Sequence, residues 1–261
     1  MIFLFRNGPG RLGNHLFNLF FILALSKKYK QNIFLLKTNY LLKYFDLKKE
    51  FFKDQSILKP IQQISYKSLS KPLNYKFNYV LKPPILGSYF FDFYKDNIDF
   101  TIKNKYNSNR INTNMFNVAI HFRGTDFVQW DKKSILSSTY YLNSIKYILK
   151  QNKKVLFYLY YDDDSLKSFK EVLKFLKTNN KKFELGNSNK LFMYDLSEMS
   201  QCNSIISSPS TFCIWASFLG YPKKDIFHSK DWIRYQLQKN DKFWIDLTQN
   251  GKSCYNKFIL I

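Results

Sequence analysis

The chain has 261 residues, of which 45% are hydrophobic and 19% aromatic, and this composition excludes global disorder. Its formal net charge of +22 admits nucleic acid, an anionic membrane surface or an anionic small molecule as a partner. Solvated lysines account for much of this charge, and the lysines are spread in short runs without a dense basic arm, which favours the small molecule.

The first 36 residues predict a strand, helix and strand in succession. Residues 2–5 form an apolar run, residues 8–13 a glycine-rich turn, residues 14–29 a helix that Asn14 caps, and residues 32–36 a second strand. The apolar part of this helix, residues 16–25, is too short to span a bilayer. Because no signal-peptide pattern precedes it, we expect a cytoplasmic protein, with peripheral membrane association left open by the basic surface.

The stretch 40–112 has no clear period, and we expect short helices and loops there, followed by a linker at 104–114. Strands and helices then alternate again. The expected strands are 117–122, 154–160 and 204–207, and the expected helices are 138–151, 165–178, 191–201 and 209–220. The chain therefore reads as an α/β protein with two halves, residues 1–112 and 113–261.

Three cysteines occur, Cys202, Cys213 and Cys254, and none forms a C-x-x-C pair or has a histidine cluster beside it. This pattern argues against a disulfide framework or a zinc site and predicts buried free thiols.

Two glycine- or serine-rich turns precede helices, where free N–H groups attract anions. The first turn carries Gly8, Gly10 and Gly13 and leads into Asn14 and His15. Without an acidic residue about twenty positions later it is not a dinucleotide fingerprint, and a plain strand-to-helix turn is the alternative.

The second turn spans residues 207–212. Ser208 is the expected N-cap, with Pro209 at the first helical position, so that Ser210 and Thr211 offer hydroxyls to a phosphate. Capping without any ligand is the alternative.

Charged residues follow two of the predicted strands. Arg123, two residues after His121, can hold a diphosphate with its two-pronged guanidinium, and Asp126 can orient that arginine or accept a proton. A surface histidine and a purely structural pair of Arg123 with Asp126 are the alternative. The run 162–164 contains three aspartates, which can ligate a metal, accept hydrogen bonds from guanine or cap the next helix.

Taken in order, these motifs resemble the α-1,2-fucosyltransferases of glycosyltransferase family 11. The family's G-x-L-G-N-Q-x-F loop corresponds to residues 10–17, its H-x-R-R-G-D-Y donor motif to 121–127 and its N-S-T-F-S-W-W run to 209–215. A D-x-x-x-M-x-x-C pattern is met by Asp195, Met199 and Cys202, and residues 87–94 loosely echo the family's middle motif.

The resemblance implies a GT-B-like fold with two Rossmann-like halves facing a cleft. Residues 1–112 would form the acceptor side and 113–261 the donor-binding half, with the C-terminal segment packing back on the first half. It also implies inverting transfer of fucose from GDP-fucose to a glycan hydroxyl, with α-1,2 linkage to galactose, without a metal, cofactor or nucleic acid.

By the same resemblance, Arg123 would bind the β-phosphate, His121 and either Asp162 or Asp163 would contact guanine, and Ser210, Thr211 and Phe212 would close over the diphosphate. Gly13, Asn14 and His15 would face donor and acceptor. Two departures stand out: Gly124 replaces the family's second arginine, and His15 replaces its glutamine. Asp126 and His15 are the candidates for the general base.

Three other interpretations stay open at this point. A GT-B transferase could use another nucleotide sugar, which GDP and UDP binding would distinguish. A basic nucleic-acid-binding protein would bind DNA or RNA with a steep salt dependence. An inactive family member would follow from the loss of the second arginine.

Overall fold

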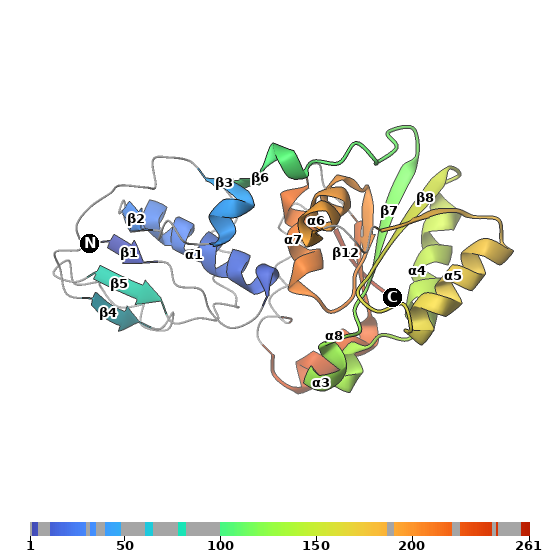
Figure 1. Cartoon of the computed structure of the whole chain (residues 1–261). Helices are drawn as coiled ribbons and strands as arrows, with labels where there is room; N and C mark the ends of the chain where they lie inside the picture. Colours follow the sequence, from blue (N-terminus) through green and yellow to red (C-terminus); the bar gives the residue numbers. More distant parts are fainter. Residues whose placement is uncertain are drawn as a thin grey trace. The chain divides into compact units, whose positions relative to one another are not determined.

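The computed structural model describes residues 2–4, 11–29, 32–34, 40–47, 61–64, 78–81, 100–186, 191–220, 225–241, 244 and 257–261. The chain forms two compact units, Met1–Asn104 and Lys105–Ile261, drawn in Figure 1.

The first unit is built on a parallel sheet with the strand order β2-β1-β5-β4. Helix α1 (Leu12–Tyr29) connects β1 (Ile2–Leu4) to β2 (Asn32–Phe34) and buries an apolar face that includes Leu16 and Phe17. This confirms the predicted strand–helix–strand opening. Because α1 begins at Leu12, Asn14 lies within its first turn, and the prediction that Asn14 caps the helix was wrong.

The region from 40 to 112 contains strands that the sequence did not predict. Strands β4 (Ile61–Ile64) and β5 (Asn78–Leu81) complete the first sheet. Strands β3 (Phe45–Leu47) and β6 (Phe100–Ile102) form a separate antiparallel pair, and short 3-10 turns occur at η1 (Tyr40–Lys43) and η5 (Asn104–Tyr106). The expectation of helices and loops alone was therefore wrong.

The second unit contains a six-stranded sheet in which every neighbouring pair is parallel, in the order β12-β11-β10-β7-β8-β9. Its strands are β7 (Phe116–Phe122), β8 (Val155–Tyr161), β9 (Lys182–Leu185), β10 (Ser204–Ile206), β11 (Asp225–His228) and β12 (Lys257–Leu260). Its helices are α3 (Phe127–Trp130), α4 (Ser138–Gln151), α5 (Lys167–Thr178), α6 (Phe192–Gln201), α7 (Thr211–Leu219) and α8 (Lys230–Gln238), with a 3-10 turn at η6 (Lys132–Ser134). The predicted α/β class, with a parallel sheet in each half, is confirmed.

Residues just before β7, expected to be a linker, are bound to the second unit. The Ser108 hydroxyl donates to the buried Glu198 carboxylate at 2.8 Å, and Arg110 pairs with Glu184 at 2.9 Å and with Glu198 at 3.5 Å. These contacts hold the first residues of the second unit against α6 and β9.

Two buried tyrosines of α4 fix the carboxyl ends of the central strands. The Tyr140 hydroxyl lies 2.9 Å from the carbonyl oxygen of Ser207 and 2.6 Å from that of Phe227, and the Tyr141 hydroxyl donates to the His121 carbonyl at 3.2 Å. Because parallel strands share a carboxyl edge, the segments that follow β7, β8, β10 and β11 emerge on the same side of the sheet. That edge is where the predicted strand-end residues converge.

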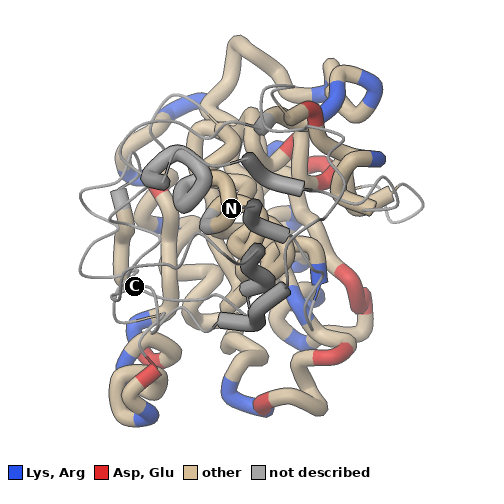
Figure 2. Tube along the Cα trace, turned by 90° about the vertical axis from the view of Figure 1, so that its left-hand side faces the viewer, with Lys and Arg blue, Asp and Glu red and all other residues tan. Residues whose placement is uncertain are grey.

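Cys202 and Cys213 are buried free thiols, as predicted, whereas Cys254 lies outside the described residues. In the described part of the chain, none of the helices has the length and apolarity needed to cross a membrane. Among the same residues, Lys and Arg are distributed over several elements, as Figure 2 shows.

Candidate active site

Arg123 follows β7 directly, and two carboxylates hold its guanidinium group. Its Nη1 lies 2.8 Å from Asp162 Oδ2 and its Nη2 lies 2.7 Å from Asp126 Oδ1. The Phe127 ring packs against it, 5.3 Å from the guanidinium carbon. The side chain is 13% exposed, and among the described residues no acceptor meets its buried Nε–H. The arginine is thus oriented by two carboxylates before any ligand arrives, while its buried Nε–H has no partner among the described residues.

Asp162, which follows β8, binds the loop after β7 through both carboxylate oxygens. Besides pairing with Arg123, it accepts the Gly124 N–H at 2.7 Å and the Thr125 hydroxyl at 2.8 Å. The structure thus gives Asp162 a role beyond the three considered for this aspartate run. It fixes the conformation of residues 123–126, the arginine loop.

Asp163 makes a local turn ahead of α5. Its Oδ1 accepts the Ser165 N–H at 2.8 Å, and hydrogen bonds from the Ser165 side chain and backbone lower the pKa of the Asp163 carboxyl. The capping alternative does not hold for this residue, because the N-cap of α5 (Lys167–Thr178) is Leu166, which makes no side-chain cap bond, and the Asp163 bond closes a turn ahead of the helix.

Gly124 occupies a position with no room for a side chain. An added Cβ would lie 2.9 Å from Asp163 Cβ, closer than Cβ atoms approach other heavy atoms in folded proteins, and 3.0 Å from Leu166 Cδ2, a tight contact with the end of a flexible side chain. The close contact between the loop after β7 and the turn after β8 explains why glycine is found where the family motif has arginine.

His121, near the end of β7, is buried and pairs with the turn after β10. Its Nδ1 lies 2.8 Å from the Ser208 hydroxyl, and its ring centroid lies 5.9 Å from that of Phe212. Burial, and then the positive charge of Arg123, lower the pKa of His121 to about 4, although Asp162 opposes this shift. The imidazole is therefore neutral at pH 7.

Ser210, not Ser208, caps helix α7. The Ser210 hydroxyl accepts the Phe212 N–H at 3.2 Å, so Pro209 precedes the helix and Thr211 is its first residue. The prediction placed the cap two residues too early, because Ser208 is taken by His121. The first turn of α7 nonetheless presents backbone N–H groups at the edge that carries Arg123.

Gly13, Asn14 and His15 lie on α1 in the first unit. His15 is 8% exposed, and its Nδ1 is hydrogen-bonded to the Tyr40 hydroxyl. Burial, reinforced by Tyr44, raises the pKa of Tyr40 above its usual range, so this hydroxyl stays protonated. Gly8, Gly10 and the segment 87–94 lie outside the described residues.

Sequence reasoning missed three side chains that shape this edge: Ser208 as the partner of His121, Phe127 beneath the guanidinium, and Tyr140 across β10 and β11. Phe127 is the last residue of the motif 121–127, so the sequence already placed it close to Arg123. The Ser208 contact joins residues that are 87 positions apart in the chain, and the two Tyr140 contacts join residues 67 and 87 positions apart. A local sequence pattern does not reveal contacts over such separations.

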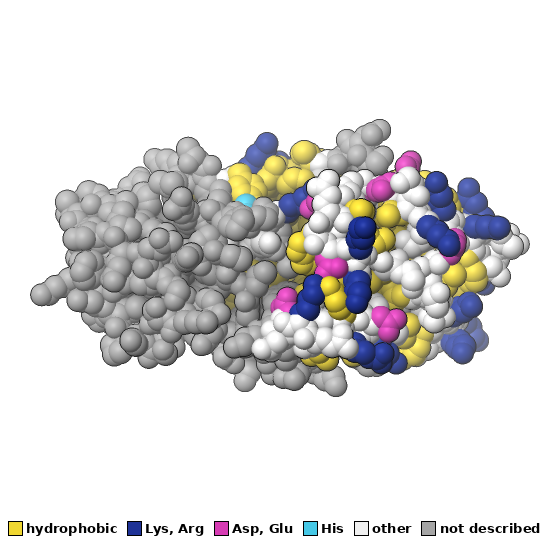
Figure 3. All heavy atoms as spheres, turned by 90° about the horizontal axis from the view of Figure 1, so that it is seen from below, with side chains coloured by type: hydrophobic (Ala, Val, Ile, Leu, Met, Phe, Trp, Pro, Cys, Tyr) yellow, Lys and Arg dark blue, Asp and Glu magenta, His cyan; other side chains and the backbone are white. Residues whose placement is uncertain are grey.

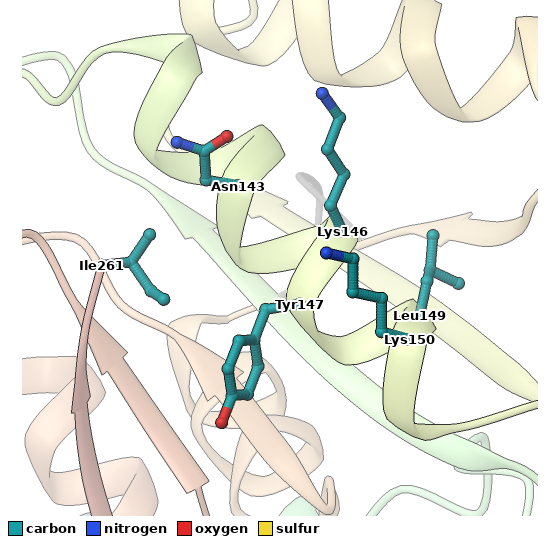
Figure 4. A pocket seen from close by; sticks show the side chains of 6 residues that line it. All are labelled: Asn143, Lys146, Tyr147, Leu149, Lys150 and Ile261. Carbon is teal, nitrogen blue, oxygen red and sulfur yellow. The ribbon is translucent and has the colours of Figure 1, made fainter.

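Elsewhere on the second unit, an open hollow lies between α4 and the end of β12 (Figure 4). Its lining contains none of the residues predicted for the site and consists of Asn143, Lys146, Tyr147, Leu149, Lys150 and Ile261. Among the described residues, no three His, Cys, Asp or Glu side chains gather in a way that could hold a metal ion.

Comparison with known structures places the fold among fucosyltransferases. The α-1,6-fucosyltransferase NodZ soaked with GDP-fucose matches with a TM-score of 0.56 and 10% identity, over 84% of this chain and 92% of that one. NodZ from Bradyrhizobium, crystallised as selenomethionine protein, matches with a TM-score of 0.54, also at 10% identity over the same shares of the two chains. POFUT1 in complex with GDP-fucose matches with a TM-score of 0.59 and 12% identity, over 84% and 94%.

No curated protein sequence matches the chain significantly. The model of the family described as "Glycosyl transferase family 11" matches residues 10–246, a span that covers most of each unit and contains Arg123, the aspartates after β8 and the turn before α7. The chain therefore belongs to glycosyl transferase family 11 and is a glycosyltransferase.

Proposed function

We propose that the protein transfers fucose from GDP-fucose to a hydroxyl group of a glycan acceptor, with inversion at the fucose anomeric carbon and without a metal ion. The proposed acceptor sugar is galactose, and the fucose would be joined to its 2-hydroxyl in α-1,2 linkage. The observation that carries the proposal is the oriented Arg123, held by Asp162 and Asp126 at the carboxyl edge of a parallel sheet. The family and the likeness in fold to two fucosyltransferases support it.

In this reaction the acceptor oxygen attacks the anomeric carbon as the bond from that carbon to the β-phosphate oxygen breaks. Negative charge then builds up on the departing GDP, and a guanidinium group can neutralise it through two parallel hydrogen bonds. Arg123 is suited to this role because Asp162 already fixes its direction, so little reorganisation is needed when the charge develops.

Asp126 is the more exchangeable of the two carboxylates on Arg123. Its side chain is 43% exposed, against 22% for Asp162, and besides Arg123 it has a weaker, 3.4 Å contact with the Thr125 hydroxyl. A phosphate oxygen would replace the Asp126 carboxylate on Nη2 while Asp162 keeps hold of Nη1. Donor binding would then release Asp126.

The remaining donor contacts follow from the turn after β10. Ser210, Thr211 and Phe212 at the start of α7 would supply N–H groups and hydroxyls to the diphosphate. His121 and Asp163 are the proposed partners of guanine, and the neutral His121 ring already packs near Phe212. In this scheme the donor is bound by the C-terminal half, residues 113–261, and the N-terminal half, residues 1–112, serves the acceptor.

Asp126 and His15 are the two candidates for the base that takes the acceptor proton, and Gly13 and Asn14 are proposed to flank the substrates. An Asp126 carboxylate released by donor binding would be available as a base only once the donor is in place. His15 would act through the imidazole that Tyr40 orients. Substituting His15→Gln and Asp126→Asn, one at a time, and recording pH–rate profiles separates them, because loss of the true base removes the acidic limb.

The direct test is transfer of labelled fucose from GDP-fucose to lactose. Arg123→Ala should reduce the rate by about 100-fold or more, and Arg123→Lys should recover only part of it, because lysine keeps the charge without the two-pronged geometry. Arg110→Lys is the matched control, since Arg110 also pairs with two carboxylates but lies before β7. Equal activity of Arg123→Ala and the wild type would remove Arg123 from the mechanism.

A further inference from the structure

Helix α3 carries two large apolar side chains into solvent directly after the arginine loop. Trp130 is 59% exposed and Val128 is 47% exposed. A single exposed apolar residue on a protein surface is ordinary. Here, however, the exposed indole belongs to a series of aromatic contacts that begins at Arg123, because the Phe127 ring lies 5.3 Å from the guanidinium carbon and 5.2 Å from the Trp130 ring.

The exposed indole is held in place from its other side as well. Trp130 lies 6.0 Å, between ring centroids, from Trp232 of α8, which is only 2% exposed. Asp131, at the end of α3, accepts hydrogen bonds from the Tyr235 hydroxyl at 2.9 Å and from Lys239 at 2.8 Å. Helix α3 is thereby fastened to α8, and the indole presents its open surface without the freedom of a loop side chain.

Seen from the side on which α3 and α8 lie, the described surface of the second unit shows hydrophobic side chains among basic and acidic ones (Figure 3). A rigid, partly open aromatic ring beside charged groups suits a sugar, whose ring has an apolar face of C–H groups and a rim of hydroxyls. Such a face stacks on an aromatic ring while the hydroxyls remain solvated.

We infer that the α3 surface formed by Val128 and Trp130 binds the acceptor glycan, with a sugar ring stacked on the Trp130 indole. This inference rests on the proposed function, and it adds an acceptor contact to the donor-binding half. The exposure of Trp130 favours the acceptor over the guanine of the donor. Nucleotides held for chemistry are mostly buried, whereas a glycan chain continues from its reacting sugar into solvent.

Ligand-observed saturation-transfer NMR tests this with the full chain, GDP and lactose. The Trp130→Ala variant should weaken lactose binding about tenfold, and Trp130→Phe should retain most of it, because a smaller aromatic face remains. Leu185→Ala is the control: Leu185 is 42% exposed at the end of the edge strand β9, and its loss should leave lactose binding unchanged.

GDP affinity, measured in parallel by calorimetry, distinguishes a failure of the acceptor assignment from a failure of the proposed function. Normal GDP binding with equal lactose binding by the wild type and Trp130→Ala overturns the acceptor assignment alone. Loss of GDP affinity in Trp130→Ala also overturns it, because the ring would then serve guanine. Absence of saturation transfer from the wild-type protein to lactose, with GDP bound, rejects the surface as an acceptor site. Failure of the wild type to bind GDP refutes the proposed function itself.

Discussion

The two carboxylates on Arg123 should contribute very differently to stability. Asp162→Ala removes three contacts at once: the ion pair with Arg123 at 2.8 Å and the acceptors for Gly124 N–H and the Thr125 hydroxyl. Asp126→Ala removes the ion pair with Arg123 at 2.7 Å and the weak contact with the Thr125 hydroxyl from a side chain that is 43% exposed. In both variants Arg123 keeps its other carboxylate, so the comparison measures what Asp162 contributes through its hydrogen bonds to the arginine loop and its deeper burial.

The magnitudes follow from these contacts. Two hydrogen bonds at about 1 kcal/mol each, together with a partly buried ion pair of about 1 kcal/mol, give a loss of about 3 kcal/mol for Asp162→Ala. For Asp126→Ala the loss should not exceed about 1 kcal/mol, because an exposed ion pair is screened by water. The expected difference is therefore about 2 kcal/mol.

Tryptophan fluorescence during urea unfolding measures this difference in the free energy of unfolding of the second unit. All four tryptophans, Trp130, Trp215, Trp232 and Trp244, belong to the second unit, so the signal reports that unit alone. Asp231→Ala serves as the control, since this 92% exposed carboxylate lies 3.9 Å from Arg234 and its loss should not be measurable. Should Asp126→Ala destabilise the unit as much as Asp162→Ala, Asp162 would not be the residue that fixes the arginine loop.

Three further outcomes are expected. Gly124→Ala should destabilise the second unit by about 1–3 kcal/mol, because the new Cβ overlaps Asp163, and an unchanged urea midpoint would contradict the packing described here. Stability should fall as the pH drops from about 6.5 towards 4: burial lowers the pKa of His121 to about 4 and that of His228 to about 3, so the unfolded chain binds these protons first. Each imidazole adds a slope of up to about 1.4 kcal/mol per pH unit in urea titrations, and a flat profile would mean that both rings bind protons as readily in the native state as in the unfolded chain. Fucose transfer should persist in EDTA, and loss of turnover that Mg²⁺ or Mn²⁺ restores would assign the aspartate run after β8 to metal binding.

Elements of the second unit with strong periodic patterns could be predicted from the sequence. The strand of residues 117–122 is buried along nearly its whole length, and the helix of residues 138–151 alternates buried and exposed positions, so both gave clear signals. Strands β3 to β6 have only three or four residues each, and unlike β1 and β2, which are equally short, they do not flank a helix with a clear apolar pattern such as α1. Their pairing depends on long-range contacts that the sequence does not display.

The convergence of the site could be predicted, but not its internal contacts. Parallel strands deliver their following residues to one edge, which is why Arg123 and Asp162 were both expected there. That Asp162 turns back to bind the Gly124 N–H depends on a tertiary approach of two loops. Likewise, Ser208 satisfied the sequence criteria for a helix cap, and only the neighbouring His121 shows why Ser210 takes that position instead.

The central claim, a GDP-sugar site organised by Arg123, is tested most directly by calorimetric titration of the protein with GDP, with UDP as the control nucleotide and EDTA present. The account predicts that GDP binds, that UDP binds far more weakly, and that Arg123→Ala loses GDP affinity while Arg110→Lys keeps it. Equal affinity for the two nucleotides would indicate a different nucleotide sugar. No binding of either by the wild-type protein would contradict the assignment of this edge as a donor site.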